Sequence, residues 1–330
     1  MLKMDMFDSL KAKIQDKNVR VVFPEGYDER ILGAVVRLKA EGILEPVLLG
    51  NPEELKAIAH DRGFDINKIE VIDPNNYDAF DEMVEAFVER RKGKATEEQA
   101  RKILRDKNYF GTMLVYHGLC DALVSGARHS TGDTVRPALQ IIKTKPGVKS
   151  TSGAFIMLRG RDQEKYLFSD CAININPDAE GLAEIAVESA KTAAMFDIDP
   201  KVALLSFSTK GSAKSPEQEK VAEATRLAKE KAPQFEIDGE LQFDAAFVEA
   251  VAKQKAPDSN VAGQATVFVF PEIQSGNIGY KIAQRLGNFE AIGPILQGMA
   301  KPISDLSRGC VEEDVYKLAI ITANQAILDD

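Results

Sequence analysis

Residues 301–315 read Lys-Pro-Ile-Ser-Asp-Leu-Ser-Arg-Gly-Cys-Val-Glu-Glu-Asp-Val, and the rest of the chain is organised around this stretch. A proline and a glycine bracket a short polar segment. Apolar residues then recur at intervals of three or four positions from Val311 to beyond Leu318. This spacing predicts a terminal helix with one buried stripe, which begins directly after the polar segment.

Three polar side chains flank the start of that predicted helix. Ser307 and Arg308 lie in the turn before it, and Asp314 lies in its first turn. Free backbone N–H groups and the helix dipole attract anions to such an end, and an arginine adds a bidentate grip on phosphate or carboxylate. We therefore expect the three side chains to converge on a negatively charged substrate. An ordinary capped helix with acidic residues in its first turn fits the same spacing.

Outward from this stretch, the N-terminal part of the chain alternates strands with helices. Such alternation predicts a parallel sheet covered by helices on both faces. The expected strands are 19–23, 46–50, 69–72 and 121–124; the expected helices are 28–41, 52–62 and 133–143, with a helical region over 77–117 that breaks near Gly93 and Lys107.

The breaker-rich segment 146–153 is the expected linker to a second domain. Beyond it we expect a hairpin (154–158 and 166–170), helices at 179–196, 216–232, 244–253 and 279–286, and strands at 201–206, 235–241, 266–270 and 291–296. The predicted fold is α/β, with residues 1–150 and 303–330 in a first domain and 151–302 in a second. The terminal helix returns to the first domain, which would place Ser307, Arg308 and Asp314 in the cleft between domains.

Composition limits the possible functions of the 330-residue chain. Its net charge of −9 argues against general binding to nucleic acid or to anionic membranes. No apolar run approaches membrane-spanning length, and residues 1–5 do not begin a signal peptide. Three cysteines without paired spacing fit a reducing cytoplasm, and three histidines without mutual spacing give no zinc signature. We expect no metal.

Several familiar motifs are absent. The loop 206–215 is rich in lysine and serine but contains one glycine, Gly211, and lacks the P-loop spacing. Residues 276–279 lack the Gly-x-Gly-x-x-Gly dinucleotide fingerprint. No Gly-x-Ser-x-Gly elbow surrounds Ser307, which argues against an esterase.

Four segments resemble the phosphate acetyltransferases, and they occur in that family's order over nearly the whole chain: 305–310 with Asp314, 125–137, 206–215 and 271–286. The resemblance implies reversible acetyl transfer between coenzyme A and inorganic phosphate, with coenzyme A as a substrate and no tightly bound cofactor. It also implies a homodimer of the short form, without an N-terminal extension, and a fold like that of isocitrate and isopropylmalate dehydrogenases.

The resemblance also implies roles for individual residues. A basic run from Arg90 to Lys107 suits the phosphates of coenzyme A, although such a run is also typical of a solvated helix face. Arg90 lies beside Arg91 and is the alternative to Arg91. The residues implied in coenzyme A binding are Arg30, Arg91 and Arg136, and those implied in substrate or phosphate binding are Ser130, Thr134, Arg136, Ser208 and Lys281.

For the chemistry we expect direct attack in a ternary complex. Asp314 would act as the base, Arg308 would hold phosphate, and Ser307 would donate a hydrogen bond to the developing oxyanion. A rival route passes through an acetyl-cysteine at Cys310, which would give ping-pong kinetics.

Three other functions fit parts of the same sequence. A phosphate butyryltransferase would share the segments that bind the anionic substrate and differ in its acyl pocket. A 2-hydroxy acid dehydrogenase on the same scaffold would need a metal and NAD(P). A non-catalytic coenzyme-A-binding module, like the phosphotransacetylase-like tails of some malic enzymes, would lack turnover.

Overall fold

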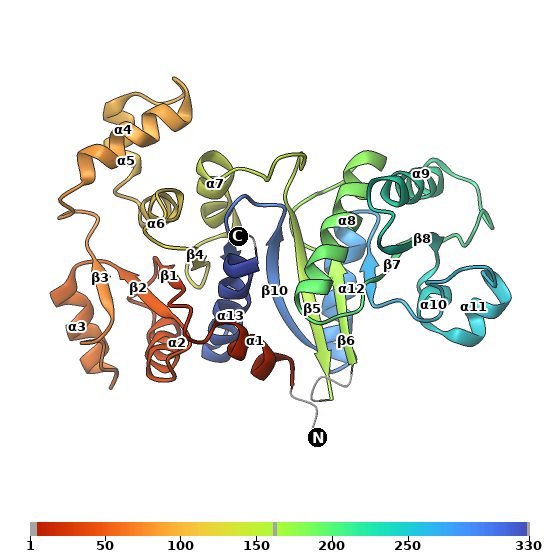
Figure 1. Cartoon of the computed structure of the whole chain (residues 1–330), viewed down its shortest axis with the longest axis horizontal. Coiled ribbons are helices and arrows are strands. Elements are labelled where there is room, and N and C mark those ends of the chain that lie inside the picture. The colour runs from red at the N-terminus through yellow and green to blue at the C-terminus, as the bar shows by residue number, and fades with distance from the viewer. Residues whose placement is uncertain (1–4, 161–163, 329–330) are drawn as a thin grey trace. The chain divides into compact units, whose positions relative to one another are not determined.

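The computed structural model describes residues 5–160 and 164–328 (Figure 1). Residues 1–4, which carry most of the segment tested for a signal peptide, lie outside these ranges. Contacts divide the chain into two units: the first contains the residues up to Lys145 and those from Met299 onward, and the second is Pro146–Gly298. These limits lie within a few residues of the domain bounds predicted above.

The first unit contains a parallel sheet with the strand order β3-β2-β1-β4-β11. Each strand is short, and all except the edge strand β3 are mostly buried, as expected where helices cover both faces. The strands are β1 (Arg20–Phe23), β2 (Glu45–Leu49), β3 (Glu70–Ile72), β4 (Ala122–Ser125) and β11 (Ile303–Asp305).

Helices cover both faces of this sheet. On one face α13 packs against α1, α2 and β4, and on the other α6 packs against α7, β1 and β4. The helices are α1 (Met6–Ile14), α2 (Glu29–Ala40), α3 (Pro52–Asp61), α4 (Phe80–Arg91), α5 (Glu97–Ile103), α6 (Lys107–Tyr116), α7 (Thr131–Ile141) and α13 (Glu312–Leu328).

The second unit contains a mixed sheet with the strand order β10-β5-β6-β9-β7-β8. β5 pairs antiparallel with both of its neighbours, and the other strand pairs are parallel. The strands are β5 (Ser152–Arg159), β6 (Glu164–Ser169), β7 (Lys201–Leu205), β8 (Glu236–Leu241), β9 (Val267–Val269) and β10 (Glu290–Gln297). The predicted α/β class with mostly parallel strands is confirmed.

In this unit α8 and α9 pack against each other and against the sheet, α10 contacts β7, and α12 contacts β5, β6 and β10. An aromatic core that includes Phe155, Phe168 and Phe268 is buried beside these elements. The helices are α8 (Ala179–Met195), α9 (Pro216–Lys231), α10 (Phe243–Phe247), α11 (Glu249–Lys255) and α12 (Ile273–Leu286).

The helix predicted over 244–253 is wrong as one element, because the chain breaks at Val248, where the backbone is extended. The carbonyl groups of Ala245 and Ala246 accept hydrogen bonds from the N–H group of Gly263. These bonds give the last carbonyl groups of α10 a partner outside the helix, so the helix does not have to continue in order to pair those carbonyls.

The start predicted for the helix at 279–286 is also wrong, since α12 begins at Ile273. Glu272 caps it by accepting hydrogen bonds from the N–H groups of Gln274 and Ser275, both at 2.8 Å. The two glycines inside this helix allow close packing rather than a break. A Cβ atom at Gly276 would lie 2.2 Å from the carbonyl oxygen of Asp170.

No helix in residues 5–160 and 164–328 is both long enough and apolar enough to cross a membrane.

Candidate active site

The turn between β11 and α13 carries two of the predicted catalytic residues, Ser307 and Arg308, and its backbone is held by hydrogen bonds to Ser125 and within the turn. Leu306 N–H donates to the Ser125 carbonyl at 2.7 Å, and Cys310 N–H donates to the Ser307 carbonyl at 2.9 Å. Ser307 and Arg308 are exposed, as a substrate-binding role requires. The turn therefore presents both side chains at the start of α13.

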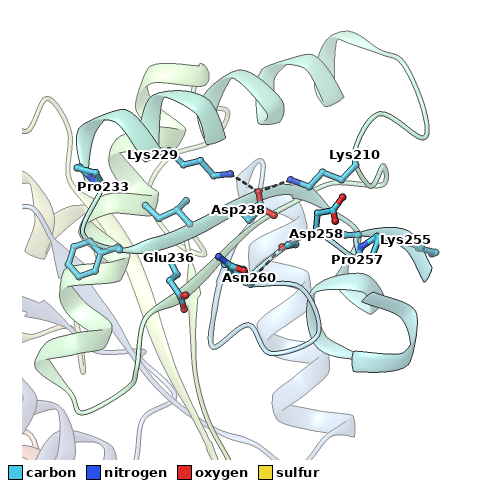
Figure 2. A pocket seen from close by; sticks show the side chains of 14 residues that line it. Lys210, Lys229, Pro233, Glu236, Asp238, Lys255, Pro257, Asp258 and Asn260 are labelled. Atoms are coloured by element: carbon cyan, nitrogen blue, oxygen red, sulfur yellow. Dashed lines mark hydrogen bonds and ion pairs between the residues drawn. The ribbon is translucent and has the colours of Figure 1, made fainter. Parts of the chain in front are cut away.

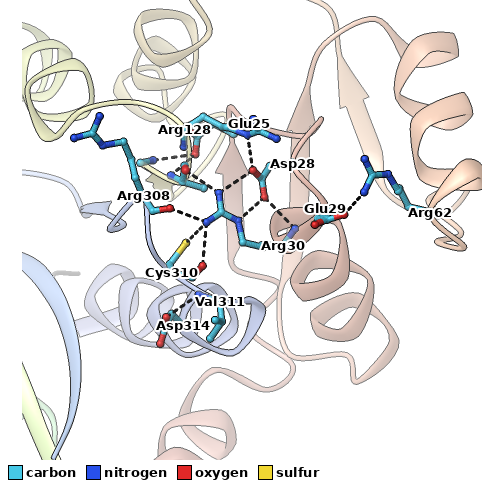
Figure 3. Close-up of polar contacts among 12 residues, drawn as sticks. Glu25, Asp28, Glu29, Arg30, Arg62, Arg128, Arg308, Cys310, Val311 and Asp314 are labelled. Atoms are coloured by element: carbon cyan, nitrogen blue, oxygen red, sulfur yellow. Dashed lines mark hydrogen bonds and ion pairs between the residues drawn. The ribbon is translucent and has the colours of Figure 1, made fainter. Parts of the chain in front are cut away.

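Asp314 is half-buried and caps α13. Its Oδ2 atom accepts a hydrogen bond from Val311 N–H at 2.8 Å, and Ser307 Oγ accepts one from Gly309 N–H at 3.3 Å. Figure 3 shows the guanidinium of Arg308 pointing away from the carboxyl group of Asp314. The shared turn brings these residues close in the chain, but their charged groups would have to approach each other to contact one substrate together.

The loop after β4, which leads to the predicted substrate-binding residue Ser130, gives its backbone N–H groups to a buried protein carboxylate. Glu25 is 0% exposed and accepts hydrogen bonds from four consecutive residues, 126–129, at 2.7 to 3.0 Å. Its Oε1 also lies 2.7 Å from Nδ1 of His129. These N–H groups are thus occupied in this structure. The first turn of α7, which follows the loop, is the part of this segment open to a ligand.

Glu25 was not among the predicted site residues, although it follows β1 at the edge where parallel sheets bind ligands. A glutamate directly after a buried strand was the available signal. Its four partners lie 101–104 residues away along the chain, so no local pattern predicts them.

The three predicted residues around α7 have different surroundings. Ser130 is exposed, and its Oγ donates to Asp133 Oδ2 at 2.7 Å, while its backbone N–H donates to the same oxygen at 3.2 Å and so caps the helix. Arg136 is exposed. Thr134 is 1% exposed, so its hydroxyl lies beneath the helix rather than at the surface. Ser130 and Arg136 are accessible to a substrate in this structure, and Thr134 is not.

Asp305, at the end of β11, is a buried acid that sequence analysis gave no role. Its Oδ1 atom and Oγ1 of Thr134 have no hydrogen-bond partner in the described part of the chain. Burial raises the pKa of the Asp305 carboxyl from its ordinary value of 3.8 to about 6, against the effect of the hydroxyl of Thr131. An acid with this pKa takes up a proton close to neutral pH.

Arg90 and Arg91 have distinct environments at the end of α4. Arg90 donates to the carbonyl groups of Ile141 and Ile142 at 2.6 and 2.9 Å and lies over the ring of Tyr116. Arg91 lines a hollow of about 310 Å³ together with Lys94, Lys102 and Tyr109. The geometry therefore favours Arg91 over Arg90 as a ligand for phosphate.

Arg30, also predicted to bind coenzyme A, is instead engaged by the protein. Its guanidinium pairs with Asp28, with Nε 2.9 Å from Oδ1 and Nη2 2.9 Å from Oδ2, and it also bonds backbone carbonyl groups (Figure 3). Burial would raise the pKa of Asp28, but hydrogen bonds from Arg30 and Arg128 lower it to about 2. Both partners are therefore charged at neutral pH.

In the second unit, Ser208 is 0% exposed, which does not favour its predicted contact with substrate. Its hydroxyl donates to Glu240 Oε1 at 3.0 Å and accepts from Ala213 N–H at 3.1 Å, so it fastens the loop 206–213. Lys281 is exposed on α12, with Nζ 5.7 Å from the centre of the Tyr280 ring.

The cysteines are free and buried. Burial raises the pKa of the Cys310 thiol to about 11, although Arg30 acts to lower it. Cys310 therefore stays protonated at neutral pH, which disfavours the acetyl-cysteine route. Among residues 5–160 and 164–328, no group of three or more histidine, cysteine, aspartate or glutamate residues is arranged to hold a metal ion.

A hollow of about 770 Å³ lies along the edge strand β8 (Figure 2). Its floor is Asp238, whose carboxylate pairs with Lys210 at 2.6 Å and Lys229 at 2.8 Å. Burial acts to raise the pKa of Asp238, but these lysines lower it to about 2. The predicted site residues do not line this hollow.

Comparisons with known proteins agree along nearly the whole chain. A family model described as "Phosphate acetyl/butaryl transferase" matches residues 5–323. Phosphate acetyltransferase of Bacillus subtilis is 64% identical over 98% of this chain and 99% of its own length. A phosphotransacetylase structure from Streptococcus pyogenes is 63% identical, covers 98% of both chains and has a TM-score of 0.95.

A more distant structure, of a putative 4-hydroxythreonine-4-phosphate dehydrogenase from Salmonella typhimurium, is 14% identical. It covers 93% of this chain and 99% of its own chain, with a TM-score of 0.52. This likeness concerns the fold alone, and it agrees with the expected similarity to dehydrogenases.

Proposed function

The chain belongs to the Phosphate acetyl/butaryl transferase family, and we propose that it transfers an acetyl group reversibly between coenzyme A and inorganic phosphate. The observation that carries the proposal is the near full-length similarity to relatives named phosphate acetyltransferase. The exposed Ser307 and Arg308 at the start of α13 supply the anion site that this reaction needs.

In the direction of acetyl phosphate, a phosphate oxygen attacks the thioester carbonyl and the thiolate of coenzyme A leaves with the electron pair of the broken C–S bond. Arg308 holds the phosphate, and the hydroxyl of Ser307 donates to the oxyanion of the tetrahedral intermediate. Loss of one such donor typically lowers the rate by about 10²–10³.

In the reverse direction, the thiol of coenzyme A attacks acetyl phosphate, and Asp314 accepts the thiol proton. The C–S bond forms as the C–O bond to phosphate breaks, and phosphate leaves beside Arg308. A half-buried carboxylate is placed to do this once it leaves the N–H group of Val311, which it now caps.

Arg91 and Arg136 are the arginines best placed to bind the phosphates of coenzyme A. Neither guanidinium makes a hydrogen bond or ion pair to the described residues. The positive charges of both act to lower the pKa of the Tyr109 hydroxyl, which burial raises. Their free donors suit the 3′-phosphate and diphosphate of this substrate. Coenzyme A is a substrate here and not a resident cofactor.

We further propose a cytoplasmic homodimer. The three free cysteines suit a reducing compartment. The helix α12 exposes Ile278, Ile282 and Leu286 at a spacing of four residues, and such an apolar stripe suits burial against a second copy. Light scattering of the purified chain would return twice the chain mass; a monomer at micromolar concentration would reject the dimer.

The test of the function is an assay with acetyl-CoA and phosphate that follows release of the thiol and formation of acetyl phosphate. Butyryl-CoA in place of acetyl-CoA measures the alternative within the family, and we expect acetyl-CoA to have the higher kcat/KM. Faster turnover of butyryl-CoA would favour the butyryltransferase, and absence of turnover with both would favour a binding module.

A further inference from the structure

Arg30 uses every donor that an arginine has. A guanidinium carries five N–H groups. Nε and one N–H of Nη2 bond the two carboxylate oxygens of Asp28, and the other N–H of Nη2 donates to the Ala127 carbonyl at 2.7 Å. The two N–H groups of Nη1 donate to the carbonyls of Arg308 and Cys310, each at 2.9 Å. No donor is left for a substrate phosphate (Figure 3).

These bonds connect three separate segments within the first unit. Asp28 caps α2, Ala127 belongs to the loop after β4, and Arg308 and Cys310 belong to the turn before α13. The bonded residues of that turn lie 278 and 280 positions from Arg30. Arg30 is therefore the point at which the start of α2 is fastened to the turn with Ser307 and Arg308.

The partner of Arg30 is itself fixed. Asp28 is 2% exposed and also accepts from Arg128 Nε at 2.8 Å. A bidentate arginine–carboxylate pair holds both side chains in one geometry, which a point charge cannot do. Freeing Arg30 to bind a ligand would leave a buried carboxylate with fewer donors, at considerable cost.

We propose that Arg30 is a positioning residue that holds the turn 307–310, and through its backbone the side chains of Ser307 and Arg308, rather than a ligand of coenzyme A. The inference rests on the proposed acetyl transfer. It predicts that loss of Arg30 impairs the binding and reaction of phosphate or acetyl phosphate at Ser307 and Arg308. The 3′-phosphate of coenzyme A belongs to Arg91 and Arg136.

The kinetic test compares coenzyme A with 3′-dephospho-coenzyme A, using acetyl phosphate as the acetyl donor. Arg91→Gln and Arg136→Gln should raise the KM for coenzyme A and bring it closer to that of the dephospho form. Arg30→Lys should keep the wild-type ratio of the two KM values and lower kcat/KM for acetyl phosphate by about 10²-fold, as expected for a misplaced catalytic group.

Asp28→Asn is the matched variant, because it keeps Arg30 and weakens the bidentate pair that orients it. We expect the same signature as in Arg30→Lys: lower kcat/KM for acetyl phosphate and an unchanged ratio between the two forms of coenzyme A. If Arg30 were a ligand of coenzyme A, Asp28→Asn would leave kcat/KM for acetyl phosphate near the wild-type value, and Arg30→Lys would narrow the ratio of the two KM values. Either result would overturn the proposal.

Hydrogen exchange tests the positioning role without turnover. In Arg30→Gln, the amide groups of residues 306–311 should exchange faster than in the wild type, while Arg91→Gln should leave them unchanged. Unchanged exchange in a folded Arg30→Gln protein would overturn the inference. A wild-type chain without acetyl transfer would reject the proposed function alone, since the exchange experiment still judges Arg30.

Discussion

Oδ1 of Asp305 lies so close to Gly126 that a Cβ atom on this glycine would be 2.5 Å from it. The same Cβ would lie 2.6 Å from both the nitrogen and the carbonyl oxygen of Leu306. Because β4 and β11 are parallel neighbours, their carboxyl ends bring the loop after Ser125 against the turn that leads to Ser307. The missing side chain of Gly126 makes this close approach possible.

Gly126→Ala should therefore destabilise the protein through both backbone and contact. The φ angle of Gly126 is +115°, which is unfavourable for alanine, and the added methyl group meets backbone atoms that cannot easily move. Gly118→Ala is the control, because its φ is +71° but nothing lies within 4 Å of the added Cβ. In urea unfolding, we expect the free energy of unfolding to fall by about 1–2 kcal/mol in the control and by more in Gly126→Ala. Equal losses would contradict the steric part of the argument.

Asp305 should make stability fall as pH rises from about 4 to about 6. Its pKa is raised in the folded chain from 3.8 to about 6, so the folded state binds more protons than the unfolded state between these values. The stabilising effect is complete below the unfolded pKa and is lost as pH rises through the folded pKa. Asp305→Asn should remove this fall, which amounts to at most about 3 kcal/mol at about 1.4 kcal/mol per pKa unit.

The measurement is chemical unfolding of both proteins at several values of pH between 4.5 and 8. Asp28→Asn serves as a control of opposite sign, because the pKa of Asp28 is lowered to about 2 and its contribution is complete throughout this range. It should lower stability by a constant amount. If the free energies of unfolding of wild type and Asp305→Asn change in parallel with pH, Asp305 does not titrate in this window.

Local pattern predicted most of the elements, but it did not predict the contacts that shape the site. Strand β1 and helix α2 were predictable because their burial patterns and the cap at Asp28 lie within a few residues. The strand β11 was missed because it spans only Ile303–Asp305, and its identity as a strand depends on pairing with β4. Glu25 and Arg30 make their decisive bonds to residues about a hundred or more positions away.

The resemblance identified Ser307, Arg308 and Asp314 by position, which no spacing argument separates from ordinary helix capping. The structure adds that Asp314 does take part in capping, through a bond from Val311 N–H, while Ser307 accepts from Gly309 N–H within the turn before the helix. The side chain that caps α13 is therefore also the proposed base. A substitution that keeps the cap is needed to separate the two roles.

Asp314→Asn makes that separation, since the asparagine carbonyl oxygen can still accept from Val311 N–H. We expect the melting temperature to change little and kcat for acetyl-CoA formation to fall by about 10²–10⁴-fold, the usual contribution of a general base. The loss should shrink as pH approaches about 8.5, where the substrate thiol ionises without help. Asp314→Ala should lose the cap as well, at about 1 kcal/mol. Near-normal turnover in Asp314→Asn at pH 7 would remove the base assignment.

Cys310→Ala should remain active, because the thiol is 6% exposed and its pKa of about 11 keeps it protonated. The change removes the 3.5 Å contact of Sγ with Nη1 of Arg30 but keeps the carbonyl bond at residue 310 that holds the turn. Initial rates with acetyl-CoA and phosphate both varied should give intersecting double-reciprocal lines in the wild type and the variant, as a ternary complex requires. Arg308→Gln is the comparison, since loss of its phosphate contact should abolish most turnover under the same conditions. Parallel lines in the wild type together with an inactive Cys310→Ala would instead establish an acetyl-cysteine intermediate, because only a covalent acyl carrier releases coenzyme A before phosphate binds.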